Sequence, residues 1–160
     1  MTMKTYPERY EDATSKIVAR ATKIEAATPA IYRAQYSLPH IVATLRAMYK
    51  DPVVHDRFVG TKFTDNKWSK GFCGLASTAI YKLYGGDDVW QMMAVRITDW
   101  EHGPVVFLKH RATGMNFGTT GEHFYPMTIP YNIGRPVDVT RLRTPNMNEF
   151  MAVLGTRLEK

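Results

Sequence analysis

Cysteine chemistry is the first reaction that this sequence suggests, because its single cysteine stands at a predicted junction between a loop and a helix. Cys73 opens an apolar helical stretch that continues to Tyr84. Backbone N–H groups at the start of a helix stabilise a thiolate, which is the nucleophilic form of cysteine. A cysteine hydrolase also needs a histidine that takes the proton of the thiol. The chemistry of Cys73 therefore depends on which imidazole can reach it.

Two downstream residues are the candidate catalytic partners of Cys73. His102 lies in a predicted turn before an apolar strand, and a turn residue can shift toward the thiol more easily than a strand residue. Asn116 lies in the next strand and can orient an imidazole. A general base must come within about 3 Å of its proton partner. In an active enzyme, the backbone N–H of Cys73 or Gly74 would contribute to an oxyanion hole.

A set of nearby residues is predicted to line a binding cleft. Trp68 and Phe72 border the polar loop before the cysteine, Gly74 follows the cysteine, and His123 lies in a later helical turn. Aromatic side chains pack in cores more often than they contact ligands, and free cysteines are commonly small core residues. These residues are therefore consistent with a cleft and equally with a core.

Composition limits the classes of protein that the chain can represent. A length of 160 residues fits a single domain, residues 1–160, with a substantial core. The sequence carries no apolar signal segment and no stretch long enough to span a membrane, so we expect a cytoplasmic protein without a membrane partner. A lone cysteine forms no internal disulfide, and no Cys/His spacing suggests zinc. We expect neither a metal nor a cofactor.

Hydrophobic spacing predicts helices first and strands later. Residues 1–60 form a helical N-terminal part, because apolar residues recur there at helical spacing. The Cys73 helix then ends at Gly85-Gly86. Strands are predicted at the apolar runs 89–97, 105–108 and 115–118. After an irregular stretch, 126–143, Thr144-Pro145 opens a final helix. Helices and strands that are segregated in this way indicate an α+β fold with a small antiparallel sheet.

Short motifs in the second half resemble those of a known family. In chain order they are Gly71-Phe72-Cys73-Gly74-Leu75-Ala76-Ser77, Leu83-Tyr84-Gly85-Gly86, Val105-Val106-Phe107-Leu108, Thr119-Thr120-Gly121-Glu122-His123-Phe124, Ile129-Pro130-Tyr131-Asn132-Ile133-Gly134-Arg135 and Thr144-Pro145. Together they resemble a family of small, uncharacterised bacterial and phage proteins with a papain-like order of cysteine, histidine and aspartate. The resemblance spans about residues 68–154. It implies a papain-like core at 68–157, decorated by the N-terminal helices.

The resemblance also implies a degenerate catalytic triad. Cys73 matches the nucleophile of the family, Val105 matches its histidine and Gly118 matches its aspartate. Neither valine nor glycine can take or orient a proton. Loss of one triad member typically costs several orders of magnitude in rate. An active enzyme would therefore need His102 and Asn116 as substitutes.

Three functions are consistent with these features. We favour a binding or regulatory protein on a degenerate papain-like scaffold, such as a phage-type protein that acts on a host factor. The alternative is a cysteine-dependent hydrolase or acyl transferase that uses Cys73 with a substitute histidine. A third function, nucleic-acid binding, is suggested by the net charge of +6. The basic residues that carry this third hypothesis are Lys16, Arg20, Lys23, Arg135, Arg141 and Arg143. A protein partner is favoured over nucleic acid because acids are interleaved with the basic residues along the chain.

Overall fold

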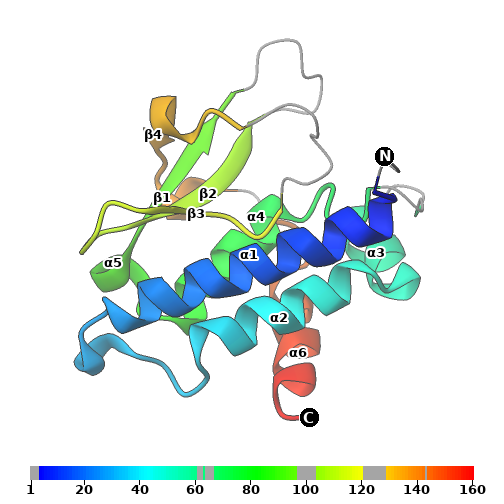
Figure 1. Ribbon diagram of the computed structural model, residues 1–160, viewed down its shortest axis with the longest axis horizontal. Coiled ribbons are helices and arrows are strands. Elements are labelled where there is room, and N and C mark those ends of the chain that lie inside the picture. Colours follow the sequence, from blue (N-terminus) through cyan, green and yellow to red (C-terminus); the bar gives the residue numbers. More distant parts are fainter. Residues whose placement is uncertain (1–3, 61–62, 64–66, 97–103, 121–128, 143) are drawn as a thin grey trace.

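The computed structural model describes residues 4–60, 63, 67–96, 104–120, 129–142 and 144–160. Its α-helices are α1 (Tyr6–Ala26), α2 (Leu38–Tyr49), α3 (Pro52–Val59), α4 (Cys73–Leu83), α5 (Gly86–Val89) and α6 (Met147–Leu158). Its strands are β1 (Trp90–Val95), β2 (Val105–His110), β3 (Asn116–Phe117) and β4 (Arg135–Pro136). Short 3-10 turns are η1 (Ala30–Tyr32), η3 (Tyr131–Ile133) and η4 (Val139–Arg141). These elements confirm the predicted α+β fold (Figure 1).

Side chains just before each N-terminal helix explain where the helices begin. Thr5 accepts a hydrogen bond from the N–H of Glu8 at 3.3 Å, and Ser37 caps α2 in the same way. Asp51 accepts from the N–H of Val53 at 2.9 Å and starts α3 directly after α2 has ended. A proline follows each of these caps in the first turn, where its missing N–H costs nothing. The N-terminal part is therefore helical for local reasons.

One antiparallel sheet holds the four strands in the order β3-β2-β1-β4. In β1 and β2 the register pairs Met92 with Leu108 and Ala94 with Val106. The outer strand β4 pairs Arg135 with Ala94. This strand lies in the stretch 126–143, which was predicted to be irregular. A strand of two residues is too short to leave a period-two pattern in the sequence.

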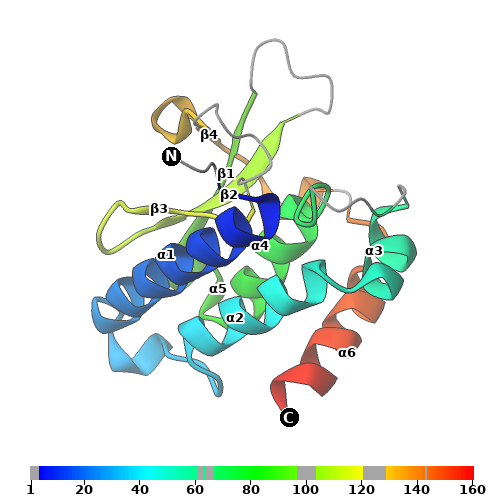
Figure 2. The same cartoon turned by 45° about the vertical axis from the view of Figure 1, so that its right-hand side comes forward.

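The two faces of the sheet belong to different hydrophobic clusters. Successive side chains of a strand point to opposite faces, so Met92 and Leu108 face the helices while Met93 and Phe107 face away. The helical side holds the main cluster, which joins the sheet to α1, α2, α4 and α6. In Figures 1 and 2, α1 and α2 lie side by side across this side of the molecule. The N-terminal helices therefore share the core of the sheet.

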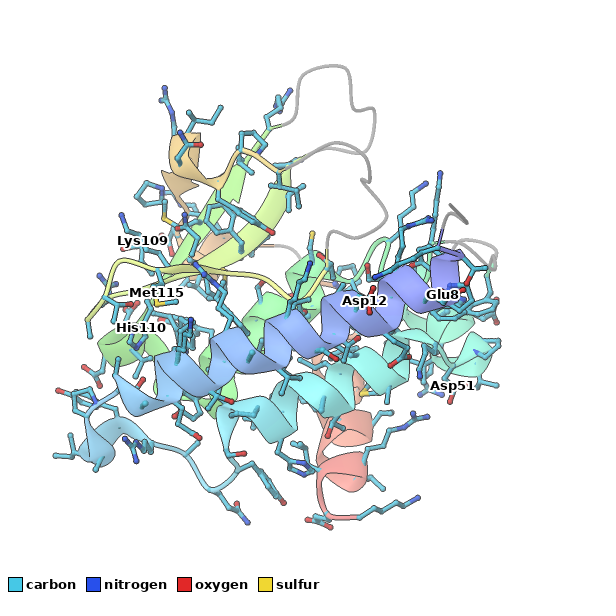
Figure 3. The ribbon with its side chains drawn as sticks, in the orientation of Figure 1. Glu8, Asp12, Asp51, Lys109, His110 and Met115 are labelled. Atoms are coloured by element: carbon cyan, nitrogen blue, oxygen red, sulfur yellow. The ribbon has the colours of Figure 1, made fainter. Side chains whose placement is uncertain are left out.

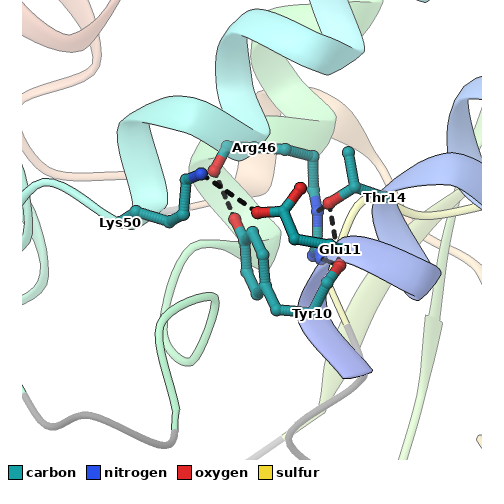
Figure 4. A network of polar contacts seen from close by, with 5 residues as sticks. All are labelled: Tyr10, Glu11, Thr14, Arg46 and Lys50. Atoms are coloured by element: carbon teal, nitrogen blue, oxygen red, sulfur yellow. Dashed lines mark hydrogen bonds and ion pairs between the residues drawn. The ribbon is translucent and has the colours of Figure 1, made fainter. Parts of the chain in front are cut away.

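A buried arginine connects the N-terminal helices to the segment that follows β3. The side chain of Arg46, on α2, is only 1% exposed. Its guanidinium donates to the carbonyl of Tyr10 at 3.0 Å, to the hydroxyl of Thr14 at 2.9 Å and to the carbonyl of Thr119 at 2.9 Å. Figure 4 shows the part of this network that joins Arg46 on α2 to Tyr10 and Thr14 on α1. The hydroxyl of Tyr49 meets that of Thr119 at 2.6 Å and reinforces the same junction.

Candidate functional site

Cys73 is the first residue of α4, and its thiol is half-buried against the main cluster. Burial raises the pKa of the thiol, because a thiolate loses solvation there. The backbone N–H groups of Val106, Gly74 and Cys73 itself act in the opposite direction, but they are the smaller effect. The helix start thus acts on the sulfur as the sequence predicts, but burial decides the sign of the shift. The thiol stays protonated at neutral pH.

The sulfur and a serine of α4 cover a part of β2 that no described strand reaches. The short strand β3 pairs with Leu108 and Lys109, so among the described residues the edge of β2 at Val106 has no strand neighbour on that side. There the hydroxyl of Ser77 donates to the carbonyl of Val106 at 3.3 Å, while the N–H of Val106 faces the sulfur of Cys73. Unpaired strand edges need such partners. The Cys73 sulfur and the Ser77 hydroxyl therefore both contact the backbone of Val106.

The position that matches the family's histidine lies on the wrong face of the sheet. Val105 belongs to the small cluster with Met93 and Phe107, which faces away from α4. The β2 residue next to the sulfur is Val106, one position further along the chain. This register differs from the one implied by the resemblance. Because both residues are valines, neither register provides a base.

Asn116 is not close to the thiol in this fold. It pairs with Lys109, three residues beyond Val106 along β2, which corresponds to about 10 Å along a strand. Its carbonyl accepts a hydrogen bond from Nε of Arg20 at 2.7 Å, so this segment is tied to α1. His102 and His123 lie outside the described residues. A Cys73–His102 pair therefore stays a prediction, and so does the role of Asn116 in orienting that imidazole.

His110 is buried at the other end of β2 and is engaged at both ring nitrogens (Figure 3). Thr28 gives its hydroxyl proton to the carbonyl of Ile24, so its oxygen accepts from Nε2 of His110 at 2.9 Å. Nδ1 is then free of a proton and accepts from the hydroxyl of Thr113 at 2.8 Å. Burial lowers the pKa of His110, which agrees with this neutral tautomer. The imidazole serves the fold.

The other two described histidines are also held by contacts of their own. Nε2 of His40 lies 2.9 Å from the carbonyl of Leu158, near the end of α6. His55 is buried, and its ring meets those of Phe63 and Phe72 edge-on, with centroids 5.5 and 5.6 Å apart. Within the described part of the chain, no histidine is therefore assigned to Cys73 by its contacts.

The predicted binding residues are distributed between core and surface. Phe72 is fully buried and stacks on Tyr49 with ring centroids 4.6 Å apart, so it has no surface with which to line a cleft. Trp68 is half-buried; its backbone N–H donates to the hydroxyl of Tyr6 at 2.8 Å, and its ring packs edge-on against Tyr10. A side chain at Gly74 would touch Thr144 at an ordinary 3.5 Å. The aromatic pair thus anchors the Cys73 loop on α1 and α2.

The N–H groups of Cys73 and Gly74 were identified from the sequence, but the contacts that Val106 makes with the thiol and with the Ser77 hydroxyl were not. Ser77 gives no signal of its own, because a serine inside an apolar helix can point anywhere until the neighbouring strand is known. Among the described residues, no group of histidine, cysteine, aspartate or glutamate side chains could hold a metal ion. None of the described helices is both long and apolar enough to cross a bilayer.

Comparison of the chain with protein-family models, with curated proteins and with solved structures gives no match.

Proposed function

We propose that this chain is a binding or regulatory protein and that Cys73 is a structural thiol rather than a nucleophile. The observation that carries the proposal is the position of the sulfur at the edge of β2, where burial raises its pKa and the adjoining residue is Val106. A reactive cysteine needs a lowered pKa, a positive neighbour or a base in contact. A degenerate papain-like scaffold that binds a protein partner, such as a host factor of a phage, agrees with these properties.

The alternative, a cysteine hydrolase, draws support from the three N–H groups around the sulfur. They resemble the donors that stabilise a thiolate or an oxyanion. The two functions differ in one property, the reactivity of the thiol at neutral pH. A base beside Cys73 gives fast alkylation at pH 6–7, whereas a structural thiol reacts only as it ionises or as the protein opens.

Alkylation of the folded protein by iodoacetamide from pH 6 to pH 10 tests the proposal. We expect Cys73 to react more slowly than glutathione at pH 7, with a rate that rises above pH 9, because the thiolate is the reacting species. The same chain in urea is the control and should react like glutathione. His102→Ala and His123→Ala should leave the rate unchanged. Fast alkylation at pH 6–7 that His102→Ala abolishes would establish the hydrolase instead.

A Cys73→Ala variant provides a second, independent measure. If the thiol is structural, the variant should fold and lose about 1 kcal/mol of stability through reduced packing at the β2 edge. Ser77→Ala, which removes the neighbouring donor to Val106, is the matched variant and should have an effect of similar size. Urea unfolding of both variants gives the values.

A further inference from the structure

A pocket lies at the corner of the sheet where β1 ends and β2 begins. Its volume is about 430 Å³. Its lining residues come from β1, β2, η3 and β4 and their flanks: Ala94, Val95, Arg96, Pro104, Ile133 and Arg135. Arg135 is placed there by its pairing with Ala94 across β1 and β4. The pocket is therefore formed mainly by β1, β4 and their flanking residues. The edge of β2 that contacts Cys73 lies on the other side of the β1–β2 pair.

Two positive charges line this pocket, and no residue that the structure describes there supplies a counter-charge. Arg96 and Arg135 are both exposed, and neither has a hydrogen bond or ion pair in the part of the chain that the structure describes. Among the described residues of the lining, none is acidic. Elsewhere, arginines are paired: Arg57 with Glu149 at 2.7 Å, Arg111 with Asp87 at 3.5 Å and Arg157 with Asp51 at 2.6 Å. The pocket is thus a place where guanidinium groups remain available to a ligand.

An exposed aliphatic side chain stands beside these arginines. Ile133 is 63% exposed, although a large aliphatic residue gains by burial. Its position is set by its neighbours in the chain. The ring of Tyr131 packs on that of Phe107 with centroids 4.7 Å apart, and a Cβ atom added at Gly134 would lie only 2.6 Å from an atom of the Phe107 ring. Because the chain is held against the sheet on both sides of it, Ile133 projects from that anchor. The pocket therefore offers apolar surface together with positive charge.

We propose that this pocket binds an acidic peptide segment of a protein partner, in which a carboxylate side chain neighbours an aliphatic one. The carboxylates would pair with Arg96 and Arg135, since a guanidinium matches a carboxylate with two parallel hydrogen bonds. The aliphatic side chain would cover Ile133 and Pro104. A nucleic-acid backbone supplies phosphates but no aliphatic group for Ile133, so the mixed lining favours a peptide. This inference rests on the proposed binding function and names its partner class.

A titration of the isotope-labelled protein with two model peptides tests the site. Ac-Leu-Asp-Glu-Leu-NH2 should shift the NMR signals of the Ile133 methyl and the Arg96 and Arg135 side chains, with a dissociation constant on the order of 1 mM. The amide counterpart, Ac-Leu-Asn-Gln-Leu-NH2, should bind about tenfold more weakly, because each lost carboxylate removes a charge-assisted hydrogen bond. Added salt should weaken the acidic peptide only.

Two variants separate the pocket from the overall charge of the protein. Arg96→Gln/Arg135→Gln should weaken the acidic peptide about tenfold. Arg141→Gln is the control: this arginine is 87% exposed, lies outside the pocket and faces Asp138 at 3.8 Å. It removes one positive charge and should change the affinity less than about twofold. Unchanged backbone NMR spectra verify that each variant is folded.

Three results would overturn the inference. They are the absence of binding, equal binding of the two peptides, and full binding by the double variant. A DNA duplex that shifts the same signals more strongly at matched salt would assign the pocket to nucleic acid instead. None of these outcomes depends on the thiol, so they leave the alkylation test of Cys73 unaffected.

Discussion

Arginines in two regions of this molecule have opposite surroundings. Arg46, between α1 and α2, is buried, and its guanidinium donates to two carbonyls and a hydroxyl while it lies over the ring of Tyr10 at 3.7 Å. Arg96 and Arg135, at the sheet corner, are exposed and have no partner among the described residues. Arg157 is intermediate, since it is one-third exposed and pairs with Asp51.

The difference in burial and pairing separates arginines that stabilise the fold from arginines that can bind a ligand. A buried polar group whose hydrogen bonds are all made within the fold holds elements together and offers nothing to a ligand. An exposed group without a partner costs the fold little and keeps its hydrogen-bonding capacity for another molecule. Cys73 belongs with the first kind, because its sulfur faces a strand N–H and packs against the core.

The largest expected effect is that of removing the Arg46 guanidinium. Arg46→Met keeps much of the aliphatic chain but leaves the carbonyls of Tyr10 and Thr119 without this donor. We expect a loss of about 3 kcal/mol in the free energy of unfolding, since unsatisfied buried polar groups cost about 1–3 kcal/mol each. Urea unfolding followed by circular dichroism measures it. A loss below 1 kcal/mol would mean that the network contributes little to stability, and that the buried Arg46 does not differ in this respect from the exposed Arg96 and Arg135.

A smaller effect is expected at the half-buried ion pair between α3 and α6. Asp51, which is labelled in Figure 3, caps α3. Its carboxylate oxygen lies 2.6 Å from a guanidinium nitrogen of Arg157. The hydrogen bond from Arg157, and then those from the backbone of Val53 and Val54, lower the pKa of Asp51. Asp51→Asn should cost about 1 kcal/mol at pH 7.

The pH dependence of the same pair gives a sign that can be checked. Because the pKa of Asp51 is lower in the folded state, its contribution is present above about pH 4 and disappears as the pH falls through the folded pKa. The stability difference between wild type and Asp51→Asn should therefore shrink between pH 5 and pH 2. A difference that stays constant over this range would show that the ion pair does not contribute.

The smallest effect on stability is expected at the sheet corner. Arg96→Gln/Arg135→Gln should change the free energy of unfolding by less than about 0.5 kcal/mol, because neither guanidinium has a hydrogen-bond or ion-pair partner in the described ranges of the chain. Urea unfolding of this double variant and of Arg46→Met under the same conditions compares buried with exposed arginines directly, since all three positions carry the same side chain. A loss above 1 kcal/mol would mean that these arginines serve the fold.

Much of the architecture could be predicted from local signals. Hydrophobic spacing predicted the helical N-terminal part, and Gly85 ended the Cys73 helix with a left-handed residue of φ 91°. The α+β class followed from the order of these elements. In contrast, β4 escaped prediction because its two residues form a strand only through Met93 and Ala94 on a distant strand.

The candidate site was predicted less well than the fold. Cys73 stands at a helix start, as its sequence context indicates, but Phe72 proved to be a core residue, and Asn116 lies on β3 opposite Lys109, three residues beyond Val106. The family's register pointed to Val105, whereas the sulfur adjoins Val106. A shift of one residue reverses the face of a strand, and no local pattern in an all-apolar run such as Val105–Leu108 can fix it.

The sequence by itself determined the helical character of the N-terminal part, the start of the Cys73 helix, the order of helices and strands, and the absence of a proton acceptor at the valines of β2. Those properties depend on residue type and on near neighbours in the chain. Only the tertiary structure decided which groups meet: that burial outweighs the helix start at Cys73, that Arg46 is enclosed, and that Arg96 and Arg135 share one pocket. Solvation and pairing depend on residues that are distant in the chain, and these are brought together only by folding.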